Sequence, residues 1–385
     1  MNSSDDQYLG NQARRTLLRA TPGSVLWALA GGLGGASAMV TAQPLTETNV
    51  PEVDRLAVRV VTDSYHHAFE PSRTVGDVQL QRVGTVLSKT GGPRTLQNEW
   101  GLSLHLASSR GSEQRQLLVD FGFTPETLNN NLGLLGIDVA QLDALVLSHG
   151  HYDHFGGLVG FLKAHQARFK RELPFYLGGE ECFCTREGGI GDNTGSFGAL
   201  DRQAIQAAGL KLNFAEKPSL IAGHAFTTGQ IPRDSFERVL SPTRFAVGLK
   251  DGVGCAPEGL SEAKRNATTL VPDDFQHEQA TAFVVKGKGL VVLTSCGHRG
   301  VVNSVRTAQK VSGVQKVHAI LGGFHLAPHP PEYLRQTAEA IKALSPDWLI
   351  PMHCSGEPFI AIAQQVLGDK VLRSSTGTRF SFSAA

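Results

Sequence analysis

The sequence predicts an α/β protein in which sheets pack against each other and helices lie outside them. Strand-like and helix-like segments alternate between residues 56 and 351, in two similar halves. Glycine is frequent, at 43 of 385 residues, which suits a fold with many tight strand-to-loop transitions. A third observation is a cluster of histidines and an aspartate that directly follows an apolar strand, ending at His154.

Four strands and a helix are expected in the first half. Leu56–Thr62 is rich in β-branched residues, and Trp100–Leu106 alternates apolar and polar residues as a half-buried strand should. Gln116–Gly122 and Asp143–Ser148 have the apolar content of buried strands. A helix is expected to open at Gly156-Gly157 and to continue through the basic stretch that ends at Arg171.

The second half begins with a segment, residues 178–270, that is expected to consist mostly of loops, with 188–193 as its clearest irregular run. Regular elements are expected after it: a hairpin of 281–286 and 290–295 around Gly287-Lys288-Gly289, helices at 301–311 and 331–344, and strands at 317–321 and 348–351.

Charge and motifs exclude several classes of function. The 36 basic and 35 acidic side chains leave a net charge of +1, which gives no global field to attract nucleic acid or an anionic membrane. No phosphate loop of the Walker type and no G-x-S-x-G elbow occurs, which disfavours P-loop and serine-esterase chemistry. The expected partner is a small-molecule substrate, and the oligomeric state stays open.

The N-terminal residues 1–43 are expected to be a signal peptide of the twin-arginine type. Arg14-Arg15 precedes an apolar, Gly/Ala-rich run from Val25 to Val40, and small residues follow in an A-x-A-like pattern. The run is too short and too rich in glycine for a stable membrane span. The sequence therefore predicts a periplasmic or secreted protein, with a linker at 44–55 and one domain at 56–385. A disordered arm with a chance arginine pair is the alternative.

The five cysteines do not form a disulfide framework, because their number is odd and they are scattered: Cys182, Cys184, Cys255, Cys296 and Cys354. A direct bridge between Cys182 and Cys184 is awkward at a separation of two. Most of the five are expected to be free buried thiols, and one bridge among the others is left open.

The residues that carry chemistry are His149, His151, Asp153 and His154. They place four ligand-capable side chains within six residues, immediately after an apolar strand. The strand end holds the backbone still, and the turn lets these side chains point into one cavity. Imidazole and carboxylate ligands suit Zn²⁺, Fe or Mn²⁺. A loop of solvated histidines is the alternative interpretation.

The segment Ser148–Gly157, SHGHYDHFGG, resembles the H-x-H-x-D-H motif of the metallo-β-lactamase superfamily. The resemblance implies an αββα four-layer sandwich with one or two metal ions, zinc first among them, at one edge. It implies that His149 and His151 hold one ion and that Asp153 and His154 hold the other. It also implies that Asp120 orients a ligand histidine from behind; a simple turn carboxylate is the alternative.

Four further motifs appear in the order of one subfamily: residues 227–233 (TTGQIPR), 294–303 (TSCGHRGVVN), 322–326 (GGFHL) and 351–356 (PMHCSG). Together they resemble proteins named 7,8-dihydropterin-6-yl-methyl-4-(β-D-ribofuranosyl)aminobenzene-5′-phosphate synthase, over roughly residues 56–380. The resemblance indicates the family better than the reaction.

Three histidines in these motifs, His298, His325 and His353, each follow an apolar strand and are expected at the same rim as the first cluster. His298 and His353 are expected to complete the metal site. His325 is either a further ligand or a proton-transfer and substrate-binding residue. The bridging aspartate of many relatives is missing after the 290–294 strand, and Cys296 or His298 stands in its place, which leaves the second metal open.

Two further positions bear on this interpretation. His277 precedes a strand where many relatives place a ligand, and is kept as a minor alternative. Trp100 stands where the relatives' E-H-G-L-S segment carries a histidine, so substrate preference is expected to differ.

The sequence therefore predicts a metal-dependent hydrolase in which an activated water attacks an ester, lactone or phosphoester-type bond. Asp153 would hold metal and orient the nucleophile, and His325 would give a proton to the leaving group. The alternatives are a transferase like the named synthase and a non-catalytic metal- or ligand-binding protein on the same fold. Redox chemistry at a di-iron centre ranks last, because no flavodoxin-like segment follows Ser355.

Overall fold

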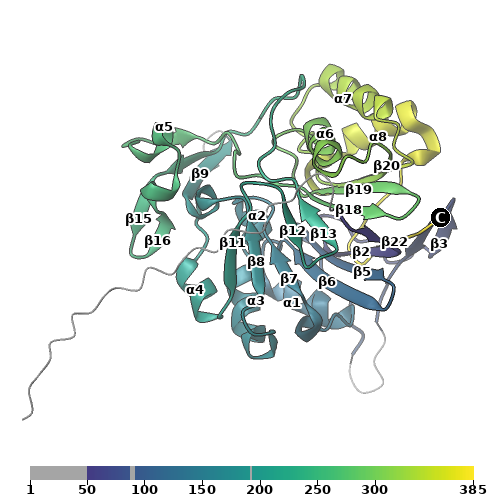
Figure 1. Cartoon of the computed structure of the whole chain (residues 1–385), viewed down its shortest axis with the longest axis horizontal. Helices are drawn as coiled ribbons and strands as arrows, with labels where there is room; N and C mark the ends of the chain where they lie inside the picture. The colour runs from purple at the N-terminus through teal and green to yellow at the C-terminus, as the bar shows by residue number, and fades with distance from the viewer. Residues whose placement is uncertain (1–49, 87–91, 191–192) are drawn as a thin grey trace, which may run out of the picture. The chain divides into compact units, whose positions relative to one another are not determined.

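The computed structural model describes residues 50–86, 92–190 and 193–385 (Figure 1). Two large sheets dominate this part of the chain. The predicted signal peptide, residues 1–43, and the first part of the predicted linker lie outside the described residues. None of the helices in these ranges is both long enough and apolar enough to cross a bilayer.

The first sheet has nine strands, in which long antiparallel strands of the N-terminal half continue into a parallel run. Their order across the sheet is β11 (Lys211–Phe214), β8 (Pro174–Leu177), β7 (Ala144–Val146), β6 (Glu113–Val119), β5 (Ser103–Arg110), β2 (Arg55–Thr62), β22 (Arg379–Ser383), β4 (Val78–Gln81) and β3 (Arg73–Val75). The C-terminal strand β22 is thus an interior strand, paired with β2 on one side and β4 on the other.

The second sheet has seven strands and comes mainly from the C-terminal half. Its order is β12 (Ser219–Ile221), β13 (Ala225–Thr227), β18 (Thr281–Val285), β19 (Gly289–Thr294), β20 (Val317–Gly322) and β21 (Trp348–Pro351), with β1 (Glu52–Val53) beside β18. Strands β19, β20 and β21 are parallel, so their carboxyl ends lie at one edge.

Three hydrophobic layers hold these sheets and their helices together. Alternate residues of β2, such as Val58 and Val60, pack between the two sheets with Phe283 of β18. A second cluster joins the outer face of the nine-stranded sheet to α1 (Pro125–Leu134) and α3 (Leu158–His165). A third joins the seven-stranded sheet to α6 (Val301–Ser312), α7 (Pro331–Ala343) and α8 (Glu357–Leu367). The predicted αββα sandwich is confirmed (Figure 1).

The prediction of an irregular run at 188–193 was wrong. Strands β9 (Thr185–Ile190) and β10 (Asn193–Gly198) pair antiparallel and join β14 (Arg244–Ala246) and β17 (Val271–Pro272) in a four-stranded sheet, and residues 191–192 lie outside the described residues. Two short strands, β15 (Gly248–Lys250) and β16 (Val253–Cys255), pair beside it. Helices α4 (Arg202–Ala207) and α5 (Glu262–Arg265) complete this region. Glycine-rich strands of this kind carry no apolar alternation, so their partners cannot be inferred locally.

The folded part begins earlier than residue 56, because β1 lies inside the predicted linker. Glu52 and Val53 pair in parallel with β18, and Val53 is fully buried in the core. Of the five cysteines, Cys182, Cys296 and Cys354 are free and buried, whereas Cys184 and Cys255 form a disulfide. The bridge that the sequence left open therefore joins the start of the β9 region to the end of β16.

Candidate metal centre

The predicted site residues meet where carboxyl ends of strands from both sheets converge. His149 follows β7, while His298, His325 and His353 follow β19, β20 and β21 in turn. His151 caps the short helix α2 (Tyr152–Phe155), which carries Asp153 and His154. Gly150 makes this sharp turn possible, because a Cβ there would lie 2.7 Å from the carbonyl oxygen of Cys182.

The first group of side chains consists of three imidazoles, His149, His151 and His298. Their ring centroids lie 4.8 Å apart for His149 and His151, 4.9 Å for His149 and His298, and 4.8 Å for His151 and His298. Phe275 stacks on the His298 ring at 3.8 Å and fixes its plane. The Nε2 of His151 also lies 3.3 Å from the hydroxyl of Thr243.

The second group consists of Asp153, His154 and His353. The Oδ2 of Asp153 lies 3.7 Å from Nε2 of His154 and 3.3 Å from Nε2 of His353. Asp120 stands behind this group: its Oδ2 lies 2.8 Å from Nδ1 of His154 and also accepts the Ser148 hydroxyl proton. Since a carboxylate can only accept, Nδ1 of His154 carries the proton and Nε2 presents its lone pair to the centre.

Cys296 occupies the position between the two groups. Its sulfur belongs to three sets of possible ligands whose atoms lie within 4.8 Å of one another: with His149 and His298, with His154 and His353, and with His325 and Cys354. The sulfurs of Cys296 and Cys354 are 3.1 Å apart. Of the two residues that could replace the missing aspartate, His298 lies in the first group and Cys296 lies centrally.

The ring nitrogens of these histidines are orphaned. Within the described part of the chain, Nε2 of His149, Nε2 of His154 and both nitrogens of His298 and of His353 are buried without a hydrogen-bond partner. Burying polar atoms without partners is unfavourable, so such a set is typical of a site built for a cation. Imidazole, carboxylate and thiolate donors together fit zinc best, because thiolate is a soft ligand.

The electrostatics of the site favour neutral ligand histidines and a bound positive charge. Burial and the neighbouring imidazoles hold the pKa of His149 and of His298 well below its usual value, so their lone pairs are free. Burial also lowers the pKa of His353, but Cys354, Asp153 and Asp63 outweigh this effect and raise it to about 9. The surroundings of His353 thus stabilise a cation, whether a proton or a metal ion.

His325 lies at the outer side of the centre and, like His151, is only partly buried. Its Nε2 lies 3.2 Å from the carbonyl oxygen of Leu240 and therefore carries a proton, while its Nδ1 lies 3.4 Å from the sulfur of Cys296. Burial lowers the pKa of His325, but the neighbouring Cys354 sulfur more than offsets this and raises it.

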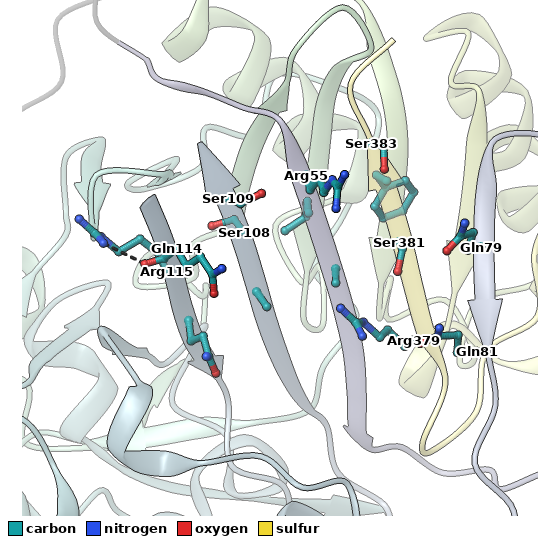
Figure 2. Close-up of a pocket in the computed structure, with 15 residues that line it drawn as sticks. Arg55, Gln79, Gln81, Ser108, Ser109, Gln114, Arg115, Arg379, Ser381 and Ser383 are labelled. Atoms are coloured by element: carbon teal, nitrogen blue, oxygen red, sulfur yellow. Dashed lines mark hydrogen bonds between the residues drawn. The ribbon is translucent and has the colours of Figure 1, made fainter. Parts of the chain in front are cut away.

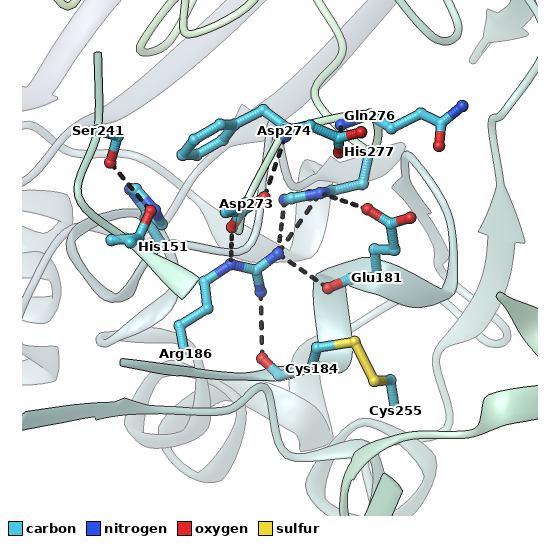
Figure 3. A network of polar contacts seen from close by, with 12 residues as sticks. His151, Glu181, Cys184, Arg186, Ser241, Cys255, Asp273, Asp274, Gln276 and His277 are labelled. Atoms are coloured by element: carbon cyan, nitrogen blue, oxygen red, sulfur yellow. Dashed lines mark hydrogen bonds and ion pairs between the residues drawn. A yellow bond between two sulfur atoms is a disulfide. The ribbon is translucent and has the colours of Figure 1, made fainter. Parts of the chain in front are cut away.

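His277, the minor alternative, is not part of either group. Its ring is separated from the His298 ring by Phe275, and its Nε2 lies 2.9 Å from a guanidinium nitrogen of Arg186 (Figure 3). The same guanidinium pairs with Asp273 at 2.7 Å and donates to the carbonyl oxygen of Cys184. His277 thus belongs to a buried polar network beside the Cys184–Cys255 disulfide.

Two supporting carboxylates and one thiol were not among the predicted site residues. Asp63, directly after β2, accepts the backbone N–H of His353, and Glu278 accepts those of His298 and Arg299. Burial raises the pKa of Glu278 to about 7. Their positions next to strand ends were the available signal for both. Cys354 follows His353 directly, but a sequence neighbour of a ligand carries no signal of its own.

An aromatic rim surrounds the entrance to the centre. A cavity of about 170 Å³ is lined at its mouth by Trp100, Phe123, Tyr152 and Phe197, which all expose a third or more of their surface. Its floor contains five site residues: His151, Asp153, Cys296, His325 and Cys354. No lysine or arginine is among the described residues that line this cavity.

Comparison with known proteins supports the family that the motifs indicate. The sequence model of the metallo-β-lactamase superfamily matches residues 110–172, which run from the end of β5 through the histidine loop. A solved structure described as a metal-dependent hydrolase of the β-lactamase superfamily has a TM-score of 0.60 at 19% identity, covering 84% of this chain and 98% of that one. The chain is thus similar in sequence to the metallo-β-lactamase superfamily around the histidine loop, and it shares the fold of the solved hydrolase.

Two relatives of this protein come from Methanocaldococcus jannaschii. A 7,8-dihydropterin-6-methyl-4-(β-D-ribofuranosyl)-aminobenzene-5′-phosphate synthase is 27% identical over 265 residues, 67% of this chain and 82% of the relative. The uncharacterized protein MJ0448 is 28% identical over 251 residues, 63% of this chain and 80% of its own. The predicted resemblance to this superfamily and the predicted fold are confirmed.

Proposed function

We propose that this protein is a metal-dependent hydrolase that cleaves a carboxylic ester or lactone carrying an apolar group. The observation that carries this proposal is a cavity with an aromatic rim whose floor includes His151, Asp153 and Cys296. These three belong to the same cluster as the buried histidines whose ring nitrogens are orphaned. Metal ligands and an apolar recognition surface thus share one small space, as expected for catalysis on a hydrophobic substrate.

The residues present would hold one or two ions. His149, His151 and His298 would hold the first, Asp153, His154 and His353 the second, and Cys296 would lie between them. When bound, zinc lowers the pKa of a water molecule to about 7 and polarises a carbonyl oxygen.

The protein's own groups supply substrate binding and proton transfer. Trp100 and Phe123 would pack against the apolar part of the substrate at the cavity mouth. Asp153, with its carboxylate facing the cavity floor, would accept a hydrogen bond from the attacking water. With Nε2 held by the Leu240 carbonyl, protonated His325 would have its Nδ1–H beside the Cys296 sulfur at the cavity floor and would give that proton to the leaving oxygen.

The chemistry of the cavity favours esters over phosphoesters. Arginine and lysine are common binding partners of phosphoryl groups, and the described lining residues of the cavity contain neither. A joining reaction like that named for the archaeal synthase is the second candidate, and its support is the 27% identity to that relative.

The test uses the full chain loaded with zinc and four probes: 4-nitrophenyl hexanoate, a medium-chain lactone, bis(4-nitrophenyl) phosphate and nitrocefin. We expect ester or lactone turnover that falls at least 100-fold in Asp153→Ala and stays unchanged in Asp138→Ala, an exposed control. Turnover of the phosphodiester alone would overturn the ester assignment. No turnover of any probe by protein with bound metal would favour the joining reaction.

A second test examines Cys296 without relying on activity. With cobalt(II) in place of zinc, we expect a thiolate-to-cobalt charge-transfer band in the near ultraviolet. The band should be lost in Cys296→Ser and retained in Cys354→Ser, because only Cys296 joins both histidine groups. Retention of the band in Cys296→Ser would show that Cys296 is not a ligand.

A further inference from the structure

The outer face of the nine-stranded sheet contains a second cavity, which shares no residue with the aromatic-rimmed one. Helices α1 and α3 cover the part of this face that lies toward β7 and β8. Over β6, β5, β2, β22 and β4 the outward side chains are polar and surround a cavity of about 460 Å³ (Figure 2). A smaller cavity of about 230 Å³ adjoins it, since both include Ala57 and Arg379.

The pairing of the strands gives this cavity the shape of a trough, with small side chains along its floor. Ala57 of β2 stands opposite Ala107 of β5 and Ser381 of β22, so a row of small side chains crosses the sheet. On one side of this row, Arg59 stands opposite Arg379. On the other side, Arg55 stands opposite Ser383 and Ser109. We call these three rows the arginine trough.

The arginine trough has positive charge without a matching negative charge. None of the described side chains that line the larger cavity is an aspartate or a glutamate. Among the described residues that line the adjoining cavity, which includes Arg59, the acidic one is Asp138, and its carboxylate already pairs with Arg168 at 2.7 Å. Like charges placed directly opposite each other on neighbouring strands are destabilising, and Arg59 faces Arg379 in this way. Arg59 donates to the carbonyl oxygen of Gly377, whereas the Arg379 side chain makes no hydrogen bond or ion pair to any described residue.

The pKa values of Arg59 and of the neighbouring His105 are lowered in part by the positive charges of the arginine pair. Burial, and then Arg379, lower the pKa of Arg59 to about 10. Burial chiefly lowers the pKa of His105, the neighbour of Arg59 on β5, to about 4, and both arginines add to this effect. Two arginines that repel each other are expected where a negatively charged ligand neutralises them.

We propose that the arginine trough binds a small molecule with a phosphate monoester group. The two guanidinium groups of Arg59 and Arg379 match the two charges of the phosphate dianion, and their planar forks suit its oxygens. The rest of the ligand lies along the floor of small side chains toward Arg55. The amides of Gln79 and Gln116, which flank this floor, donate and accept hydrogen bonds and suit hydroxyl groups.

The experiment measures the thermal midpoint of the full chain with glycerol phosphate as the probe, in a buffer otherwise free of phosphate and sulfate. We expect the probe to raise the midpoint of the wild type, because a ligand that binds only the folded state stabilises it. Arg379→Gln and Arg59→Gln should each weaken the apparent affinity at least tenfold. Arg244→Gln, on the small sheet, is the matched control and should keep the wild-type response.

If Arg59 and Arg379 form a ligand site, the thermal midpoint of the protein without ligand provides a second test. Because the two charges oppose each other, Arg379→Gln should unfold at the same temperature as the wild type or higher when no probe is present. Asp153→Ala separates the trough from the metal centre and should keep the full response to glycerol phosphate. A response that survives in Arg379→Gln and disappears in Asp153→Ala would place the anion at the metal centre and overturn the proposal. A response to citrate but not to glycerol phosphate would also overturn it.

Discussion

Asp120 shows how one buried carboxylate can organise a metal centre that it does not enter. It accepts hydrogen bonds from the backbone N–H of Ser148 at 2.8 Å and from the Ser148 hydroxyl at 2.7 Å, and it contacts Nδ1 of His154 at 2.8 Å. The first two bonds fix the start of the histidine loop. The third fixes the tautomer of His154, so that the other nitrogen faces the ions.

Replacing Asp120 by Asn should therefore weaken metal binding. The amide cannot satisfy the Ser148 N–H, the hydroxyl and the imidazole N–H at once, so His154 loses its preferred tautomer. We expect zinc affinity to fall by about 10–100-fold, measured by competition with a chromophoric chelator. Asp138→Asn, on the exposed side of the domain, is the control. Equal affinities in the two variants would show that Asp120 has no role in orienting the ligand.

Sequence analysis could place those site residues that lie close together both in the sequence and in the structure. His149, His151, Asp153 and His154 lie on one loop, so their meeting required no knowledge of the sheets. The central position of Cys296 depends on how β19, β20 and β21 line up with β7 across two sheets. Cys296 and His298 are two positions apart in the loop that follows β19, and both enter the centre, so their spacing did not indicate which of them lies between the two groups.

At the scale of elements, strand β9 connects the metal centre to the small sheet. Arg186 on β9 is almost fully buried, pairs with Asp273 and reaches the carbonyl oxygens of Cys184 and Glu181. The disulfide at Cys184 fixes the residue just before this strand. Together these contacts hold the backbone against which Gly150 of the histidine loop packs.

Removing the Arg186 charge should destabilise the whole domain. Arg186→Met leaves the Asp273 carboxylate buried without its partner, which lowers the free energy of unfolding by about 3–5 kcal/mol. Urea denaturation at neutral pH measures this loss. The double variant Arg186→Met/Asp273→Leu should recover part of it, because no unpaired charge remains. A single variant as stable as the exposed control Arg244→Met would contradict the assigned role.

Helices and strands with a periodic pattern of apolar residues were predictable from the sequence, and those without such a pattern were not. The strand at 56–62, the hairpin near residue 287 and the helix at 301–311 all appear close to their predicted bounds. The β9–β10 hairpin contains glycines where a strand usually carries apolar residues, and β14, its partner on the other side, lies far away in sequence. Its strand character comes from tertiary pairing and not from local preference.

At the scale of the whole molecule, one half-buried histidine should shape stability in acid. The pKa of His105 in the folded protein is lowered to about 4 from 6.5, chiefly by burial. Between these two values the unfolded chain binds the proton more readily, so stability is full above pH 6.5 and falls as the pH drops toward 4. The loss is about 3 kcal/mol. In His105→Gln, the free energy of unfolding measured by urea titration should fall less between pH 6.5 and 4. A profile identical to that of the wild type would refute the role of His105.

We also propose that the protein is exported in the folded state through its N-terminal segment. The Cys184–Cys255 disulfide supports this, since such bonds persist mainly in oxidising compartments. Replacing Arg14 and Arg15 by Lys together should leave the protein in the cytoplasm of a bacterium with twin-arginine export. Fractionation and immunoblotting measure this, with Arg19→Lys as the control. Release of the double variant at the wild-type level would exclude this route.

The interior position of β22 has a consequence for how the chain is synthesised. Arg59 on β2 makes a hydrogen bond to Gly377, 318 residues further along the chain, so the side of β2 that faces β22 stays unpaired until those residues have been translated. Until then, the nascent chain has an open apolar sheet edge of the kind that associates with other chains. This topology therefore favours protection of the nascent chain by a chaperone on the ribosome.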